Sequence, residues 1–370
     1  MKKLLLIALI IRLFLQLVAG VAMAYLPFTP SYPHWDITLV NQGPQWLWFW
    51  GGFDGVHYLN IAEKGYEYGL TQAFFPVYPL LIKFFNYLVG NRLITALLIS
   101  HLSFIGFVYF FVKLGRLDFP RKSVNWAGVL FLLFPASFFL FGVYTESLFL
   151  LLAAACFYFA RRSQFLAAAG LAGLASATRL VGIFLLPVVL WEYYRANKNH
   201  RALTLGWYGL ISGSGLLLYL NYLQRRFHDW LIFVHSQPGF GAGRQVNELV
   251  LPYQVVARYA KMFLSVSPVN AIYPVLVFEF LATLGFTGLI VYAFLKKLRS
   301  SYLLFIIPAL LLPTLTGTFA SMPRYGLIAF PLFYLLGDLK KKYLKIILAA
   351  GFGLTLVWAL VRFSRGLWLA

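Results

Sequence analysis

Long apolar runs separated by short polar connections make up most of the chain. A helix that crosses a bilayer needs about 20 predominantly apolar residues, and this pattern predicts about eleven such helices. Seven of them run over about 4–26, 93–112, 126–140, 165–176, 180–194, 203–223 and 346–360, and the other four end near 161, 296, 321 and 340. The expected fold is therefore an all-α polytopic membrane protein in which residues 1–370 form a single membrane domain.

Two longer segments interrupt this pattern, at about 27–72 and 224–270. The first is followed by 73–85, which is apolar but short and contains Pro76 and Pro79. Proline disrupts the interior of a helix, so this piece is predicted to be an interfacial or re-entrant helix instead of a full span. Counting spans from the N-terminus places both long segments on the same side of the membrane.

The distribution of charge gives the expected orientation. Only 11% of the residues are charged, yet the formal net charge is +20. Lys and Arg gather at every second connection, which is typical of loops on the cytoplasmic side, so the two long segments are expected to be external. A nucleic-acid-binding protein would gather this charge on a soluble face, and that class is excluded. The last span would leave Arg362 and Arg365 outside, so its orientation stays open.

The first apolar run, preceded by Lys2 and Lys3, has some features of a signal peptide. However, it contains Arg12 and Gln16, it is longer than a typical signal core, and it lacks a clear small-residue cleavage site. We therefore expect 4–26 to be retained as the first membrane helix, with the two lysines on the cytoplasmic side.

Residues with useful chemistry fall on the predicted external side. They are Asp54, His57, Glu63, Glu146, Arg179, Arg244, Lys261 and Arg324. Carboxylates combined with several cations suit an anionic, lipid-linked ligand, because Arg and Lys neutralise a phosphate while a carboxylate accepts a proton. No nucleotide-binding motif and no metal-ligand spacing accompanies them. We expect a sugar donor that arrives already activated on a lipid phosphate, with no other cofactor and no assigned metal site; metal dependence stays open.

The segment 50–58 concentrates this chemistry in the first external loop. It places Asp54 and His57 three residues apart, among aromatic residues and glycines. One hypothesis is that Asp54 is a catalytic base at the membrane surface. The alternative is a loop in which Asp54 caps a short helix, because Asp is a favoured residue at helix N-termini.

Two more candidates lie at predicted helix ends. Glu146 faces either the interior of the helix bundle, where a carboxylate in a membrane avoids lipid, or only the N-terminus of its own helix, where negative charge is favourable. These two roles can coexist. For Arg179 the alternative is a side chain that extends to the membrane interface, and for Arg324 it is the anchoring of a helix end.

Several segments, in order, resemble the PIG-V mannosyltransferases, which add the second mannose to glycosylphosphatidylinositol precursors, and their prokaryotic relatives. The matching segments are 53–59 (FDGVHYL), 62–66 (AEKGY), 74–80 (FFPVYPL), 134–137 (FPAS), 144–149 (YTESLF) and 177–179 (ATR). They lie in the first half of the chain, and the second half resembles the family only in general layout. The order and spacing of the segments make the resemblance fairly specific.

The resemblance implies a GT-C-type glycosyltransferase, which takes a sugar from a polyprenyl phosphate and inverts the anomeric carbon. In that superfamily an acidic residue of the first external loop is the catalytic base, and the matching residue is Asp54. Asp36 is the alternative, although its neighbours do not match the motif. His57 and Tyr58 belong to the same motif and are expected to bind substrate, with ordering of the loop as the other role for His57.

The expected function is thus transfer of a sugar, by resemblance mannose, to a lipid-linked or cell-envelope acceptor on the outer face of a prokaryotic plasma membrane. Arg179, Arg244, Lys261 and Arg324 are candidates for binding the departing phosphate. A different class, a flippase or transporter of lipid-linked saccharides, would use the same cations without chemistry. A third class, a non-catalytic subunit of a glycosylation complex, would keep the fold without needing Asp54.

Overall fold

The computed structural model describes residues 1–67, 70–197, 201–246 and 248–369, and every regular element in these ranges is helical. The longer helices are α1 (Lys2–Tyr25), α4 (Asp54–Lys64), α5 (Val77–Val89), α6 (Arg92–Gly115), α7 (Arg121–Leu133), α8 (Glu146–Arg161), α9 (Phe165–Ser176), α10 (Leu185–Ala196), α11 (Ala202–Phe227), α13 (Pro252–Ser265), α14 (Tyr273–Leu295), α15 (Ser300–Thr314) and α18 (Lys342–Ser364). The shorter ones are α2 (Trp35–Thr38), α3 (Gln45–Trp48), α12 (Ile232–His235), α16 (Met322–Tyr325) and α17 (Pro331–Gly337), with the 3-10 turns η1 (Val40–Gln42), η2 (Phe49–Gly51), η3 (Thr71–Ala73), η4 (Ser137–Phe141), η5 (Leu180–Phe184) and η6 (Gln237–Phe240).

Five helices of the described ranges are long and apolar enough to cross a membrane: α1, α6, α11, α14 and α18. The prediction of an all-α polytopic membrane protein is therefore confirmed. Each of the other predicted spans coincides with a shorter helical segment. The span at 126–140, for example, is broken between α7 and η4, where Pro135 disfavours helical backbone at the preceding residue. The number of spans stays a prediction.

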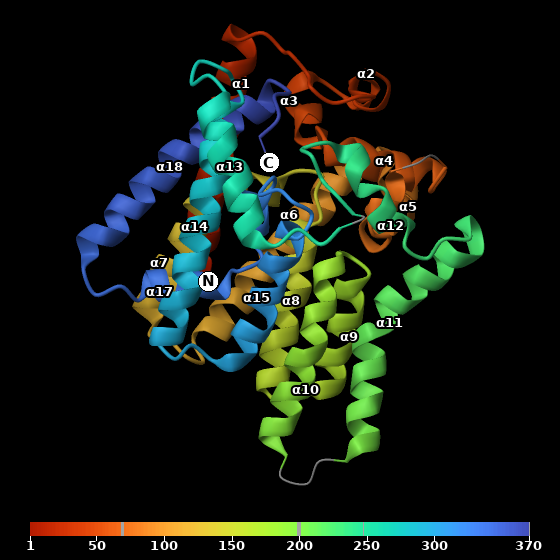
Figure 1. The fold of residues 1–370 in the computed structure, drawn as a ribbon, viewed down its shortest axis with the longest axis vertical. Helices are drawn as coiled ribbons and strands as arrows, with labels where there is room; N and C mark the ends of the chain where they lie inside the picture. The colour runs from red at the N-terminus through yellow and green to blue at the C-terminus, as the bar shows by residue number, and fades with distance from the viewer. Residues whose placement is uncertain (68–69, 198–200, 247, 370) are drawn as a thin grey trace.

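The two long segments lie together at one end of the molecule (Figure 1). The short helices α2, α3 and α12 lie at this end, as do α13 and the C-terminus. The end of α10 and the start of α11, which flank a connection predicted to be cytoplasmic, lie at the opposite end; residues 198–200 of that connection fall outside the described ranges. The separation expected from the charge pattern is thus present in the fold. Helix α5 (Val77–Val89) overlaps the segment 73–85 that was expected to form a short helix, and its interfacial or re-entrant position stays a prediction.

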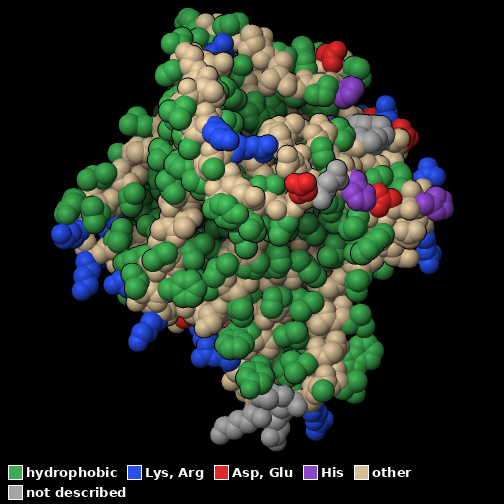
Figure 2. Space-filling view, in the orientation of Figure 1, with side chains coloured by type: hydrophobic (Ala, Val, Ile, Leu, Met, Phe, Trp, Pro, Cys, Tyr) green, Lys and Arg blue, Asp and Glu red, His purple; other side chains and the backbone are tan. Residues whose placement is uncertain are grey.

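The outer surface is apolar in a way that fits a lipid environment. Figure 2 shows hydrophobic side chains over most of one face, with many Lys and Arg side chains gathered along its lower edge. Leu218 of α11 is 69% exposed and Leu354 of α18 is 75% exposed. Monomeric soluble proteins rarely expose contiguous apolar patches larger than a few hundred Å², so we assign these faces to contact with lipid.

Close helix packing forms the interior. Helix α8 is buried along most of its length and carries the one cysteine, Cys156, which is fully buried and forms no disulfide. Helices α9 and α11 touch through glycines, because a Cβ on Gly215 would lie 2.0 Å from the backbone oxygen of Gly173. Small residues at such positions allow two helix backbones to approach closely in a membrane.

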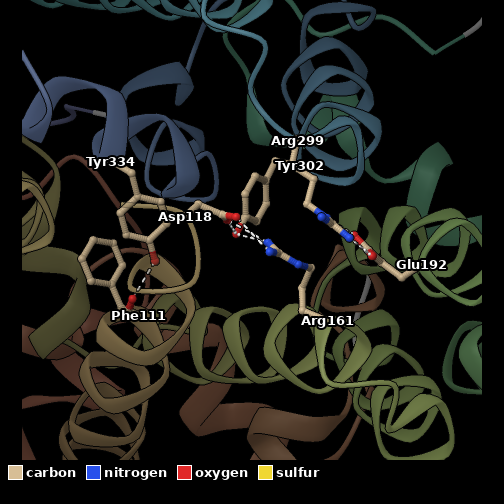
Figure 3. Close-up of polar contacts among 7 residues, drawn as sticks. All are labelled: Phe111, Asp118, Arg161, Glu192, Arg299, Tyr302 and Tyr334. Carbon is tan, nitrogen blue, oxygen red and sulfur yellow. Dashed lines mark hydrogen bonds and ion pairs between the residues drawn. The ribbon is translucent and has the colours of Figure 1, made fainter. Parts of the chain in front are cut away.

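Two ion pairs join helix ends at the side predicted to be cytoplasmic (Figure 3). The carboxylate of Asp118, just after α6, accepts hydrogen bonds from Arg161 of α8 at 2.7 and 2.8 Å and from the Tyr302 hydroxyl of α15 at 2.9 Å. Burial acts to raise the pKa of Asp118, but these hydrogen bonds outweigh it and hold the pKa below its ordinary value. The second pair joins Glu192 of α10 to Arg299 at 2.6 Å.

The fold gives a direct prediction for the orientation of the chain. Asn41, in the first long segment, and Lys340, at the opposite side, are both exposed, and the buried Cys156 should give little background labelling. We expect a membrane-impermeant maleimide to label Asn41→Cys in intact cells, and Lys340→Cys only after the membrane is permeabilised. The reverse pattern would contradict the orientation. The unsubstituted protein is the control.

Candidate active site

Asp54 is the first residue of α4 and lines a cavity with a volume of about 280 Å³. Its side chain is 24% exposed, and Oδ2 lies 2.6 Å from Nη1 of Arg324. Asp54 therefore does occupy a helix N-terminus, as the capping alternative proposed, but its carboxylate also faces the cavity. Because Arg324 belongs to α16, this ion pair joins the first long segment to a part of the chain 270 residues later.

The loop before α4 is fixed against the turn that precedes α8. The backbone N–H of Val143 donates to the Trp50 oxygen at 2.9 Å, and the Tyr144 hydroxyl donates to the Gly52 oxygen at 2.8 Å. A Cβ on Gly55 would lie 3.2 Å from the backbone oxygen of Val143. Glycine thus permits the close approach, which brings the start of α4 beside the start of α8.

Glu146, the first residue of α8, connects two guanidinium groups. It is buried, and its Oε1 lies 2.5 Å from Nη1 of Arg179 and 3.4 Å from Nε of Arg324. A continuous chain of alternating charge results, in the order Asp54, Arg324, Glu146, Arg179. Thr145 extends it by accepting a hydrogen bond from Arg179 at 3.2 Å. The helix-terminal and bundle-facing roles of Glu146 therefore coexist.

The two arginines of this series of ion pairs stay charged despite their burial. Burial acts to lower the pKa of Arg324, but Asp54 and Glu146 outweigh it and raise the pKa above its ordinary value. The pKa of Arg179 is raised in the same way, mainly by Glu146. Arg324 also lies 5.5 Å from the centre of the Phe139 ring, a cation–π contact. Two carboxylates and two guanidinium groups balance one another.

Arg244 is a third guanidinium on the cavity wall, contributed by the second long segment. Nη1 donates a weak hydrogen bond to the Phe240 oxygen at 3.4 Å, and Arg244 forms no ion pair with any residue that the structure describes. Aromatic and apolar side chains complete the wall, including Phe74, Tyr325 and Trp368. The cavity thus has a net positive charge next to a carboxylate.

The other candidates from the sequence occupy different places. Tyr58 lines the cavity, and its hydroxyl lies 3.5 Å from Oγ1 of Thr145. His57 lies beside the cavity and stacks on Phe74, with ring centres 4.8 Å apart. Burial lowers the pKa of His57, more than Asp54 raises it, so the imidazole is neutral at pH 7. Lys261 is exposed on α13 and does not line the cavity.

One further buried carboxylate was not predicted from the sequence. Glu279 is buried within α14, where Oε2 accepts a hydrogen bond from the Tyr259 hydroxyl at 2.6 Å and Oε1 has no hydrogen bond to a described residue. Tyr259 also lies 3.5 Å from Thr318, in the segment that leads to Arg324. The available signal was an acidic residue inside an apolar helix, which is expensive in a membrane and therefore informative.

The geometry leaves few groups that could hold a metal ion. Within the described ranges, no three His, Cys, Asp or Glu side chains come close enough together to do so. The fold and the cavity define a class: a multi-pass, all-helical membrane protein with carboxylates and guanidinium groups gathered at one end.

Comparison with known proteins gives the family. Residues 4–238 match the family model described as mannosyltransferase (PIG-V), so the chain belongs to this family of membrane mannosyltransferases. The chain is also 38% identical over 117 residues to human GPI alpha-1,6-mannosyltransferase 2, a match that covers 27% of this chain and 22% of the human protein. No solved structure matches the chain. The resemblance proposed from the sequence is confirmed, and Arg244 and Arg324 lie beyond the matched residues.

The buried ion-pair network predicts that two glutamates differ strongly in their contribution to the free energy of unfolding. Glu146→Ala leaves two buried guanidinium groups without their shared partner, so we expect the free energy of unfolding to fall by about 3–5 kcal/mol. Glu63→Ala is the control, because Glu63 pairs with Arg92 at 3.0 Å but is 39% exposed, and exposed pairs contribute about 0–1 kcal/mol. Denaturant titration in one detergent measures both. Equal losses would contradict the proposed importance of the buried network.

Proposed function

We propose that this protein transfers mannose from a polyprenyl-phosphate donor to a lipid-linked or cell-envelope acceptor, with inversion at the anomeric carbon. The single observation that carries the proposal is the carboxylate of Asp54, which faces the cavity and is held by Arg324. We propose the outer face of a prokaryotic plasma membrane as the place of the reaction; the basic helix ends at the other end of the fold support the outer face. The partners are the lipid-borne donor, the acceptor and the bilayer.

In the proposed reaction, Asp54 is the general base. The carboxylate accepts the proton of an acceptor hydroxyl while the oxygen of that hydroxyl bonds to the anomeric carbon. The bond between this carbon and the phosphate oxygen breaks, and the electron pair leaves with the lipid phosphate. Arg324 orients the carboxylate before the proton arrives. Afterwards Arg324 keeps a carboxylate partner in Glu146, so protonation of Asp54 does not isolate a buried cation.

Charge balance within the cavity indicates which cation binds the leaving phosphate. Arg179 and Arg324 already face Glu146 and Asp54 at 2.5 and 2.6 Å. Arg244 lines the same cavity and forms no ion pair within the part of the chain described. A guanidinium group makes strong, paired hydrogen bonds to phosphate oxygens. We therefore assign the phosphate to Arg244. Arg179, which lines the same cavity, is the second cation near the phosphate.

The base is tested by Asp54→Asn, which keeps the size of the side chain and removes its ability to accept a proton. We expect kcat for transfer from a polyprenyl-phosphate mannose donor to fall by about 10²–10⁴-fold. The matched control is Asp36→Asn, an exposed aspartate of the same loop, for which we expect unchanged transfer. The measurement is the radiolabelled glycolipid formed by purified protein in liposomes.

Two results would contradict this proposal. Transfer by Asp54→Asn at the rate of the unsubstituted protein would remove Asp54 as the base. Movement of labelled lipid across the vesicle membrane, with no glycosidic product formed by the unsubstituted protein, would identify a flippase or transporter instead of an enzyme.

A further inference from the structure

The two cavity cations that lie beyond the family match, Arg244 and Arg324, come from segments that are distant in the sequence but adjacent in the fold. Arg244 follows η6 in the second long segment, and Arg324 belongs to α16. The backbone N–H of Gln245 donates to the Thr316 oxygen at 2.8 Å. The segment that carries Arg244 is therefore held against the segment that leads to Arg324.

Arg258 of α13 contacts both segments at once. Its Nη1 donates one hydrogen bond to the Gly317 oxygen at 2.6 Å and another to the Gly243 oxygen at 3.1 Å. Both glycines have a positive φ, 65° at Gly243 and 89° at Gly317, which glycine adopts without steric cost. A Cβ on Gly317 would lie 3.1 Å from this same nitrogen of Arg258. The two backbone oxygens thus converge on one guanidinium group.

Packing against α14 fixes the helix that carries Arg258. Tyr259, the next residue, is buried and donates a hydrogen bond to Glu279 of α14 at 2.6 Å. The centre of the Tyr259 ring also lies 4.9 Å from that of Phe319, two residues after Gly317. Helix α13 therefore holds Arg258 in a fixed position relative to Gly317.

Arg244 depends on the contact with Arg258 more than Arg324 does. Arg324 forms two ion pairs with carboxylates. The guanidinium of Arg244 has one weak hydrogen bond, at 3.4 Å, and no ion pair among the residues that the structure describes. The place of Arg244 on the cavity wall therefore depends on the backbone on either side of it, which is held at Gly243 by Arg258 and at Gln245 by the hydrogen bond to the neighbouring segment.

We propose that Arg258 is a positioning residue for donor binding, because it holds Gly243 so that the neighbouring Arg244 lines the cavity. The inference rests on the proposed function, in which Arg244 binds the phosphate of the lipid-borne donor. Arg258 itself does not line the cavity, so it acts through Arg244. A segment that is ordered before the donor arrives loses less conformational entropy on binding, and the donor binds more tightly as a result.

Arg258→Ala tests this role because it removes both hydrogen bonds. We expect KM for polyprenyl-phosphate mannose to rise about tenfold, while KM for the acceptor stays unchanged. Arg226→Ala is the matched control, since Arg226 is an exposed arginine at the end of α11 and does not line the cavity. For this control we expect both KM values to equal those of the unsubstituted protein.

Two further measurements separate positioning from a general loss of structure. In the Arg244→Gln background, Arg258→Ala should change KM for the donor by less than about twofold, because the side chain that Arg258 positions is already absent. Hydrogen exchange in the peptide that contains Gln245 should become faster in Arg258→Ala, whereas exchange in the buried helix α8 should stay unchanged.

The outcomes separate this inference from the proposed function. Equal donor KM values for Arg258→Ala and the unsubstituted protein would overturn the role of Arg258, and so would a tenfold rise that persists in the Arg244→Gln background. If Arg258→Ala unfolds, which would appear as fast exchange in α8, Arg258→Gln repeats the comparison under the same criteria. Failure of the unsubstituted protein to use any polyprenyl-phosphate donor would overturn the proposed function, and the role of Arg258 in donor binding with it.

Discussion

Mutual neutralisation of four buried or half-buried charges is the constraint on which the end of the molecule that carries the site depends. Asp54, Arg324, Glu146 and Arg179 alternate in sign along one chain of ion pairs. Each residue comes from a different segment, namely the starts of α4 and α8, the entry to η5, and α16. Removing one partner would leave a buried charge uncompensated, which costs several kcal/mol. The network therefore holds four helix ends in one arrangement.

In this arrangement each polar group of the cavity has different charged neighbours. Arg324 lies between the carboxylates of Asp54 and Glu146, so in the proposed reaction it would keep Glu146 as a partner after Asp54 accepts a proton. Arg244 brings the positive charge that the network does not neutralise. The cavity thus combines the Asp54 carboxylate with an excess of positive charge.

The sequence predicted the fold class, but not the contacts within the site, and the membrane side of the site stays a prediction. Apolar length and loop charge suffice for helices such as α1 and α6, because both signals are local. Local sequence cannot show that Asp54 meets Arg324, which is 270 positions away. Lys261 carried the same local signal as Arg244 but lies exposed on α13. Glu279 was missed although an acidic residue inside an apolar helix was a visible signal, and its contact with Tyr259 of α13 depends on how the two helices pack.

The most direct test of the central claim is a double-mutant cycle on the rate of mannosyl transfer, using Glu146→Gln, Arg324→Gln and the combined variant. Glu146 forms an ion pair with Arg324, and Arg324 forms one with Asp54, so we expect Glu146 to act on the proposed base through Arg324. The account predicts that Glu146→Gln lowers kcat in the natural background, but by less than about twofold once Arg324 is already glutamine. If the two losses multiply, the residues act independently, and the network does not position Asp54 as described.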